Sequence, residues 1–233
     1  MKSGWTRIAV LVGMKKDPFE SFGFLHELHR RYALHPLYFF LVAQKTGIYD
    51  KNILPGKKAM RQLIQYHAKQ YPVGLHPSWK SFKDPAVLTK EKNILEEIVQ
   101  QKVTATRRHY IKMALPGTYR DLLMAGIKDD HSMGYGSING FRASVASSYN
   151  WYDLSEEKIT TLRVHPFCFM DANCYYEEKL SPDESYAQLM HYYTTCRDNG
   201  GTLITVFHNN FLGTDKRFKG WRELYTKFIS QLP

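Results

Sequence analysis

Histidine, arginine and aspartate side chains follow several apolar segments of the chain, one group after each segment. They are His76, Arg108-His109, Asp130, Asp171 and His208. Imidazoles and a carboxylate that face one cavity suit metal-assisted hydrolysis, in which a divalent ion polarises a carbonyl group and lowers the pKa of bound water toward ~7. A second histidine can then protonate the leaving group. An arginine beside a carboxylate would keep that carboxylate ionised and oriented.

His76 and His208 are the stronger candidates among the ten histidines. An imidazole directly after a buried apolar strand must find a partner or a metal. We expect most of the others to be surface or boundary residues, including His26, His29, His35, His67 and His191. The plainer alternative for Arg107-Arg108 is a solvated basic pair, and for Asp130 and Asp171 it is capping of the following turn.

The segments between these groups alternate between helical and extended patterns. Helices are predicted over residues 17–33, 57–70, 85–101, 115–125, 181–197 and 221–232. Strands are predicted over residues 37–42, 73–75, 103–106, 162–167 and 202–207, with Ile127 leading to Asp129-Asp130 and ordered loops over 134–148. In α/β folds, and in barrels especially, loops that leave the carboxyl ends of parallel strands meet at one mouth. We therefore predict one α/β domain over residues 1–233, whose mouth gathers the polar groups.

Composition narrows the class of protein. With 43% hydrophobic and 23% charged residues, the 233-residue chain has enough apolar material for a packed core, which excludes disorder. The formal charge of +10 admits an anionic partner. Lysine and arginine are spread along the chain without a nucleic-acid-binding motif, so we expect no nucleic acid and favour an anionic glycan or a phosphate-bearing precursor. The sequence contains no GxSxG elbow, P-loop or GxGxxG motif.

Cysteine usage and hydropathy bear on the compartment. Cys168, Cys174 and Cys196 include no CxxC pair, which argues against a disulfide framework and a thiolate zinc site and favours a reducing compartment. The apolar run from Ile8 to Val12 is far shorter than a membrane span. We expect a soluble cytoplasmic protein with no integral membrane segment.

Several stretches of the sequence resemble those of bacterial polysaccharide deacetylases. They are Asp17-Pro18-Phe19-Glu20-Ser21-Phe22, Pro36-Leu37-Tyr38-Phe39-Phe40-Leu41, Tyr49-Asp50-Lys51-Asn52, Gly74-Leu75-His76-Pro77-Ser78-Trp79, Met133-Gly134-Tyr135 and Gly140-Phe141-Arg142-Ala143. The resemblance covers nearly the whole chain. More narrowly, the sequence is similar to a divergent group encoded with surface-polysaccharide genes. The resemblance implies a distorted (β/α) barrel of the NodB type.

The resemblance also implies roles for particular residues. His76 matches the first histidine of the metal motif, and the metal would be a divalent ion, zinc first. His208 matches the late strand-end histidine that acts as general acid, and Asp171 stands where the family has an acidic residue near the substrate. Arg108 matches the arginine that orients the catalytic base. Substrate-binding roles then fall to Asp50, Trp79, Tyr135 and Arg142.

Two features depart from the family pattern. The second histidine of the metal motif would stand at position 80, which is Lys80, and His109 is the candidate substitute. The aspartate-rich first strand, which supplies a metal ligand and the catalytic base, has no counterpart before Asp17, and we interpret Asp17 itself as a helix cap. Three explanations of this departure are open: the start of the chain has been lost, the chain is the later portion of a longer protein, or the protein has dispensed with the catalytic base. Each predicts weak or absent catalysis by the isolated chain.

Two hypotheses of different classes follow. The first is a metal-dependent hydrolase that removes N-acetyl groups from a bacterial surface polysaccharide or its precursor. The second is a catalytically inactive carbohydrate-binding or assembly protein with an aromatic mouth that includes Trp79, Tyr135 and Trp151, because aromatic faces stack on sugar rings.

Overall fold

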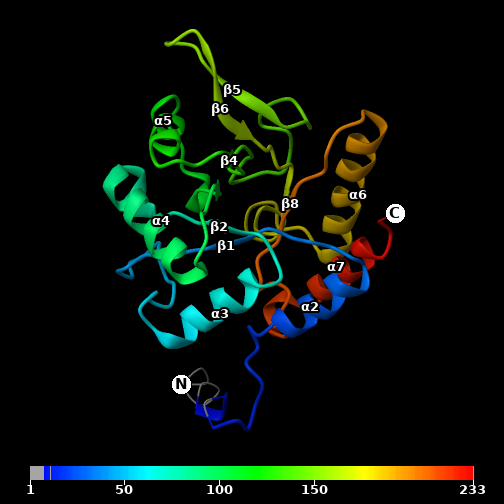
Figure 1. Ribbon diagram of the computed structural model, residues 1–233. Helices are drawn as coiled ribbons and strands as arrows, with labels where there is room; N and C mark the ends of the chain where they lie inside the picture. The colour runs from blue at the N-terminus through cyan, green and yellow to red at the C-terminus, as the bar shows by residue number, and fades with distance from the viewer. Residues whose placement is uncertain (1–7, 11, 233) are drawn as a thin grey trace.

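The computed structural model describes residues 8–10 and 12–232. The main helices are α2 (Phe22–Arg31), α3 (Lys58–Ala68), α4 (Pro85–Val99), α5 (Gly117–Met124), α6 (Pro182–Asp198) and α7 (Trp221–Ile229). The strands are β1 (Tyr38–Phe40), β2 (Val73–Leu75), β3 (Ala105–Thr106), β4 (Asp129–Asp130), β5 (Tyr149–Asp153), β6 (Lys158–Val164), β7 (Phe169–Met170) and β8 (Thr205–Val206). Four short helical segments are η1 (Trp79–Phe82), η2 (His109–Ile111), η3 (Asn173–Glu177) and η4 (Lys216–Phe218). Strands β1, β2 and β8 lie at the centre with the helices around them, and β5 and β6 lie at the top of the view (Figure 1).

The strands form two sheets. In the larger sheet the order is β1-β2-β3-β4-β6-β5, and every pair is parallel except β5 with β6. The second sheet is the parallel pair of β7 and β8. The mixed α/β class and the mostly parallel sheet are therefore confirmed. Within residues 8–10 and 12–232, the hydrogen-bonded ladders do not join into a closed ring.

Helix starts show how local sequence sets the elements. At α6, Ser181 Oγ accepts from the backbone N–H of Glu184, and Glu184 Oε2 accepts in turn from the backbone N–H of Ser181 at 2.8 Å. This capping box confirms the predicted start. The predicted start of the first helix at Asp17 is wrong by several residues, because Asp17 Oδ1 accepts from the N–H of Phe19 at 2.9 Å and closes a turn instead. The helix begins at Phe22.

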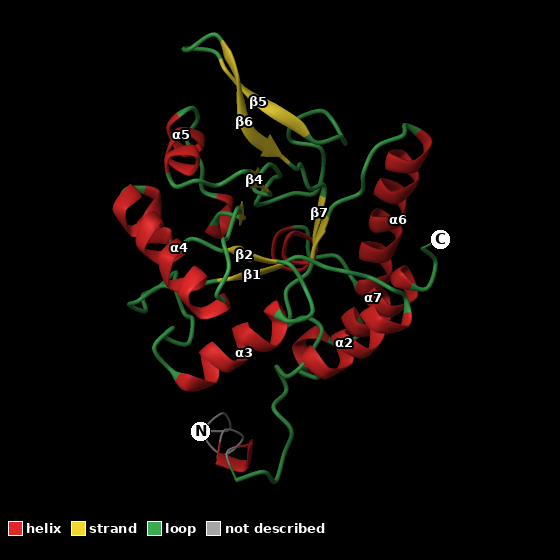
Figure 2. Cartoon of the chain, in the orientation of Figure 1, coloured by secondary structure: helices red, strands yellow, loops and turns green. Residues whose placement is uncertain are grey.

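The hairpin of β5 and β6 is an element that the sequence analysis did not predict. It extends away from the rest of the molecule (Figure 2). Hydropathy was misleading here, since Ile159 is 71% exposed whereas Thr160 is buried and donates its hydroxyl to the backbone oxygen of Trp151 at 2.8 Å. Trp151 itself is buried in the core against Tyr119. It does not belong to an aromatic mouth, and that expectation is wrong.

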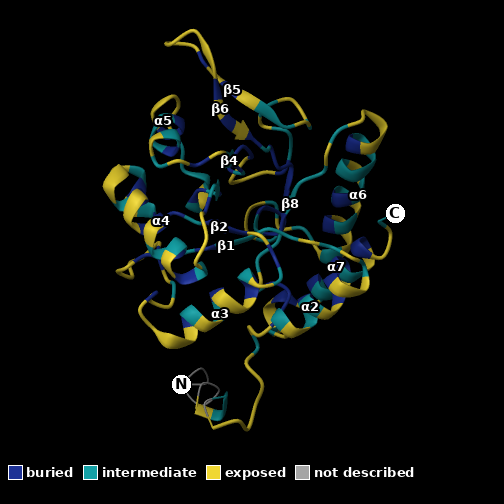
Figure 3. Ribbon diagram, in the orientation of Figure 1, coloured by how far each residue is buried: buried dark blue, intermediate teal, exposed yellow. Residues whose placement is uncertain are grey.

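Helices bury their inner faces in two main clusters (Figure 3). One cluster lies between the larger sheet and α3, α4 and α5, and the other joins α2, α6 and α7. His29 and His67 are buried, contrary to expectation. His29 Nε2 bonds to the hydroxyl of Tyr225 at 2.8 Å, and His67 Nδ1 bonds to a backbone oxygen one turn back in α3. No helix in the described segments has the length and apolar character to cross a bilayer.

Candidate active site

The register of the larger sheet places polar residues side by side at the carboxyl ends of its strands. Leu75 of β2 pairs with Thr106 of β3, so the residues that follow, His76 and Arg107, lie at the same level. The backbone N–H of Arg107 donates to the carbonyl of Leu75 at 3.0 Å, which extends the ladder to this point. His76 is therefore held at the sheet edge by backbone pairing on both sides, since its own N–H donates to Phe40 at 2.9 Å.

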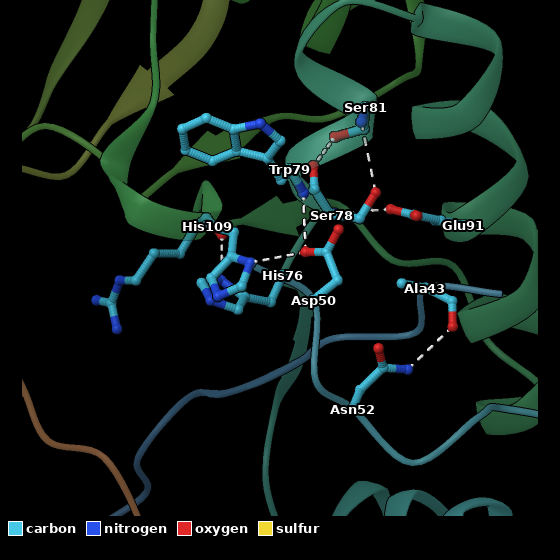
Figure 4. A network of polar contacts seen from close by, with 10 residues as sticks. Ala43, Asp50, Asn52, His76, Ser78, Trp79, Ser81, Glu91 and His109 are labelled. Carbon is cyan, nitrogen blue, oxygen red and sulfur yellow. Dashed lines mark hydrogen bonds and ion pairs between the residues drawn. The ribbon is translucent and has the colours of Figure 1, made fainter. Parts of the chain in front are cut away.

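His76 and His109 lie next to each other (Figure 4). Their ring centroids are 4.7 Å apart. His76 Nδ1 bonds to the backbone oxygen of Arg107 at 2.6 Å, and His109 Nδ1 bonds to Asp50 Oδ1 at 2.9 Å. The same Asp50 oxygen accepts from the backbone N–H of Trp79 at 3.0 Å. Each imidazole is thus fixed through Nδ1, and within the described chain neither Nε2 has a hydrogen-bond partner.

The protonation states of this pair follow from burial and charge. Burial, aided by the charge of His109, lowers the pKa of His76 to about 3. Burial also lowers the pKa of His109, although Asp50 opposes the shift. Both imidazoles are therefore neutral at pH 7. Carbonyl and carboxylate oxygens only accept, so each Nδ1 carries the proton and each Nε2 presents a lone pair.

This donor set fits part of a metal site. Histidine ligands of metals characteristically donate the second ring N–H to a carbonyl or carboxylate, as His76 and His109 do here. A catalytic zinc ion takes three protein ligands. Among residues 8–10 and 12–232, no group of three or more His, Cys, Asp or Glu side chains is placed to hold one ion. The two histidines fit as two ligands, and water or substrate oxygen would complete the shell.

The second sheet carries an aspartate–histidine pair. Met170 pairs with Val206, and Asp171 and His208 follow these strands. Asp171 is fully buried, and its Oδ1 bonds to His208 Nδ1 at 2.6 Å while its Oδ2 accepts from the backbone N–H of His208 at 2.6 Å. Ala172 N–H is a third donor to Asp171. Burial lowers the pKa of His208, but the charge and hydrogen bond of Asp171 outweigh this effect and raise it.

The two sheets direct their histidines to a common region. The charge of His208 acts on both His76 and His109 and lowers their pKa values. Arg107 acts on His76 and His208 in the same direction. The His208 side chain is 43% exposed, and within the described residues its Nε2 has no hydrogen-bond partner. The structure thus brings together three imidazoles from loops after β2, β3 and β8.

Arg107, and not Arg108, faces this region. Arg107 donates through Nε to the backbone oxygen of His131 at 3.1 Å, and its guanidinium lies over the ring of Phe39 at 4.6 Å from the centroid. Burial lowers its pKa to about 10, against the attraction of Asp130 and Asp171. Arg108 is buried, and its charge is not among those that shift the pKa values of His76, His109 and His208.

The surroundings of Arg108 differ from those of Arg107. Its guanidinium lies 6.0 Å from the centroid of the Phe82 ring, and the carboxylates that act on it are those of Asp130, Asp121 and Glu91. Successive residues of an extended chain point to opposite faces, so only one of two adjacent arginines can face the site. The role expected of Arg108 stays a prediction, and Arg107 is the one of the pair whose charge acts on His76 and His208.

Trp79 lies beside the histidine pair, but both faces of its indole are covered. Tyr49 stacks on it with centroids 4.2 Å apart and an interplanar angle of 21°. Lys112 Nζ lies 3.5 Å from the centroid, which is possible only over the opposite face. A sugar ring therefore has no open face of Trp79 on which to stack.

The remaining predicted substrate contacts have different positions. Tyr135 is 38% exposed. Arg142 is also exposed, and its Nη1 donates to the backbone oxygen of Gly134 at 3.1 Å. Asp50 is buried and holds His109, as described above. Asn173 Nδ2 donates to the backbone oxygen of Tyr135, which helps to order the loop of residues 134–148.

Sequence reasoning did not single out His131 and His165. They follow β4 and β6 at paired positions, and their rings stack at 4.4 Å and 8°. His165 Nε2 bonds to Asp129 at 2.9 Å, and its Nδ1 bonds to Ser148 at 2.8 Å. Burial and the charge of Arg107 lower the pKa of His131 to about 3. Their position directly after a strand is the signal that would have found them.

Comparisons with known proteins bear on the fold. No protein-family model matches the sequence, and no curated protein sequence matches it. Solved structures do match. A candidate polysaccharide deacetylase from Mycobacterium smegmatis superposes with a TM-score of 0.58 at 15% identity, over 88% of this chain and 69% of that one. The Puue allantoinase superposes with a TM-score of 0.61 at 13% identity, over 88% of this chain and 64% of the allantoinase chain.

A third solved structure agrees with these two. A polysaccharide deacetylase from Bacillus cereus gives a TM-score of 0.51 at 12% identity, over 92% of this chain and 84% of that one. Such low identities bear on the fold alone. The chain has the α/β fold of the NodB-like polysaccharide deacetylases, as its sequence stretches suggested.

Proposed function

We propose that the protein is a metal-dependent hydrolase that removes N-acetyl groups from a bacterial surface polysaccharide or its precursor. One observation supports this most: two neutral imidazoles, whose Nε2 atoms have no partner in the described chain, lie within range of the charge of His208, which a buried carboxylate holds. This arrangement stands at the strand ends of a deacetylase fold. It combines ligands for a Lewis acid with a proton donor, the two parts that amide hydrolysis needs.

His76 and His109 are the residues that would hold a divalent ion, with zinc the first choice. When bound, such an ion would polarise the amide carbonyl and lower the pKa of a water molecule. Asp50 positions His109 through the bond to Nδ1, which keeps Nε2 turned toward the site. Asp50 is thereby a positioning residue in this proposal.

His208 is the proposed general acid. Asp171 raises the pKa of His208, which favours the protonated ring with a proton on Nε2, and it fixes the ring through Nδ1. As the acetyl C–N bond breaks, His208 Nε2 gives its proton to the leaving nitrogen and the hydroxyl of water joins the acetyl carbon. The remaining proton of that water restores the proton on His208, so the products are the free amine and acetic acid. Arg107 is the proposed positive neighbour of Asp171. Tyr135 and Arg142, both exposed, are proposed contacts of the glycan.

The hydrogen bonds of two carboxylates, Asp50 and Asp171, support a second function. Asp50 and Asp171 each hold a histidine, so in the described part of the chain neither is left as the base that takes a proton from water. The described residues also provide no group of three or more side chains that could hold one metal ion. A catalytically inactive carbohydrate-binding or assembly protein would tolerate both features.

The proposal includes a cytoplasmic location. Cys168, Cys174 and Cys196 are free and buried, and burial raises the pKa of each thiol. A reducing compartment keeps such thiols unpaired. Cell fractionation with an antibody against the chain would test this part.

The test of the catalytic proposal is acetate release from tri-N-acetylchitotriose and from N-acetylated surface glycans. The full chain is assayed with Zn²⁺, Co²⁺ or Ni²⁺, beside His208→Ala and the control His191→Ala, which alters an exposed residue of α6. We expect metal-dependent release that falls by roughly 10²–10⁴ in His208→Ala and is unchanged in the control. Glycan binding that is equal in both variants, with no acetate under any metal, would instead establish the binding protein.

A further inference from the structure

A pocket of about 420 Å³ lies beside Trp79. Its lining is Trp79, Lys80, Lys83, Asp84 and Lys112. Pockets of roughly 300–1,000 Å³ are the size that binds small ligands in proteins. The lining is unusual in charge, because three of the five side chains are lysines and one is an aspartate.

Local structure gathers the lysines. Lys80 lies in η1 and Lys83 directly follows it, and a 3₁₀ helix of three residues per turn places positions three apart on one side. Lys112 approaches from the segment after η2, and its Nζ lies 3.5 Å from the Trp79 centroid and 4.6 Å from that of Phe82. These rings hold the Lys112 ammonium at the pocket.

The positive charge of the pocket is not cancelled locally. Over the described residues, none of the three lysines forms an ion pair with a carboxylate. Asp84 Oδ1 accepts from the backbone N–H groups of Ala86 and Val87 at 3.1 and 3.4 Å, so its charge faces the start of α4. The formal charge of the lining is therefore positive, and an anion in the pocket would meet three ammonium groups.

The pocket adjoins the candidate active site. The backbone N–H of Trp79 donates to the Asp50 oxygen that also holds His109. One residue thus borders both places. Since Tyr49 and Lys112 cover the two faces of the indole, the pocket offers charge rather than a stacking surface.

We propose that this pocket binds an anionic group of the glycan next to the sugar that carries the acetyl group. This inference rests on the proposed deacetylase function. Lysine ammonium groups act as point charges without a fixed fork, so they accept either a sugar carboxylate or a phosphate. The substrate is then an acidic polysaccharide or a phosphate-bearing precursor, and not a neutral glycan.

Calorimetric titration of the full chain tests the proposal with three probes. They are tetragalacturonate for the carboxylate, inorganic pyrophosphate for the phosphate, and tri-N-acetylchitotriose as the neutral probe. Each is titrated into the wild-type chain, into Lys80→Gln/Lys83→Gln, and into the control Lys69→Gln, which removes an exposed lysine at the end of α3.

We expect at least one acidic probe to bind more tightly than the neutral one and to lose affinity about tenfold in the double variant. The control should match wild type within about twofold, since overall charge alone acts weakly. The tighter acidic probe identifies the source of the anion. Equal binding of acidic and neutral probes, or an equal loss in Lys69→Gln, would overturn the inference.

Acetate release separates this inference from the proposed function. If the chain releases acetate but acidic probes bind the double variant unchanged, the pocket inference fails and the deacetylase stands. If acidic probes bind through the two lysines and no acetate forms under any metal, the anion pocket stands and the deacetylase fails.

Discussion

The replacement Asp171→Asn should lower the pKa of His208 across its ordinary value of 6.5. In the wild type, burial lowers this pKa, but the charge of Asp171 and its 2.6 Å hydrogen bond raise the pKa by more than burial lowers it. The variant keeps the size of the side chain and removes the charge. The influences that remain, burial and Arg107, both lower the pKa.

An opposite charge at this distance shifts a pKa by about 1–3. Because the imidazole is 43% exposed, solvent screens the interaction, and we expect a fall in the lower half of that range. The assay is an NMR titration of the ring C–H protons of His208 in both proteins. Exposed His191 on α6 is the internal control, and its titration should not move.

The reasoning is refuted by either of two results. One is a wild-type His208 that titrates below 6.5, and the other is a pKa that is the same in both proteins. Circular dichroism should show that the variant is folded. If Asp171→Asn does not fold, Asp171→Glu serves instead, because it keeps the charge and should keep the raised pKa while its longer side chain changes the hydrogen bonds.

Two further predictions concern stability. Burial lowers the pKa of His29 from 6.5 to about 4, so as the pH falls this histidine is protonated in the unfolded chain before it is protonated in the folded one. Between pH 6.5 and 4 the wild type should therefore lose roughly 3 kcal/mol of unfolding free energy, and His29→Gln should not show this loss. Denaturant unfolding at both pH values measures this, and parallel losses in the two proteins would contradict it; Gln can still bond to Tyr225. Gly74→Ala should cost about 1–3 kcal/mol, because the new methyl would lie 2.5 Å from the Phe39 ring. Gly56→Ala, which meets nothing within 4 Å, is the control, and equal effects of the two replacements would disprove the packing argument.

Much of the fold was predictable because its signals are local. The β2 strand has the predicted bounds, and the start of α6 follows from Ser181 and Glu184 alone. The hairpin was missed because its burial contradicts its hydropathy at Ile159 and Thr160. That contradiction arises from a hydroxyl that finds a backbone partner across the hairpin, which no single strand reveals.

The candidate site was partly predictable from strand ends. The rule that polar residues follow apolar strands selected His76, Asp171 and His208, and the structure places each at a strand end. Which of Arg107 and Arg108 faces the site depends on the register of β3 with its neighbours, and the sequence of β3 alone does not predict that register. The site roles themselves stay predictions until the variants are measured.

Cobalt titration tests the central claim most directly, namely that His76 and His109 together hold a divalent ion. Co²⁺ is added to the full chain and followed by visible absorption, beside His76→Ala, His109→Ala and the control His191→Ala. We predict one ion per chain in the wild type and the control, and loss of its spectrum in both site variants. Equal Co²⁺ binding by all four proteins, or none by the wild type, would contradict the account.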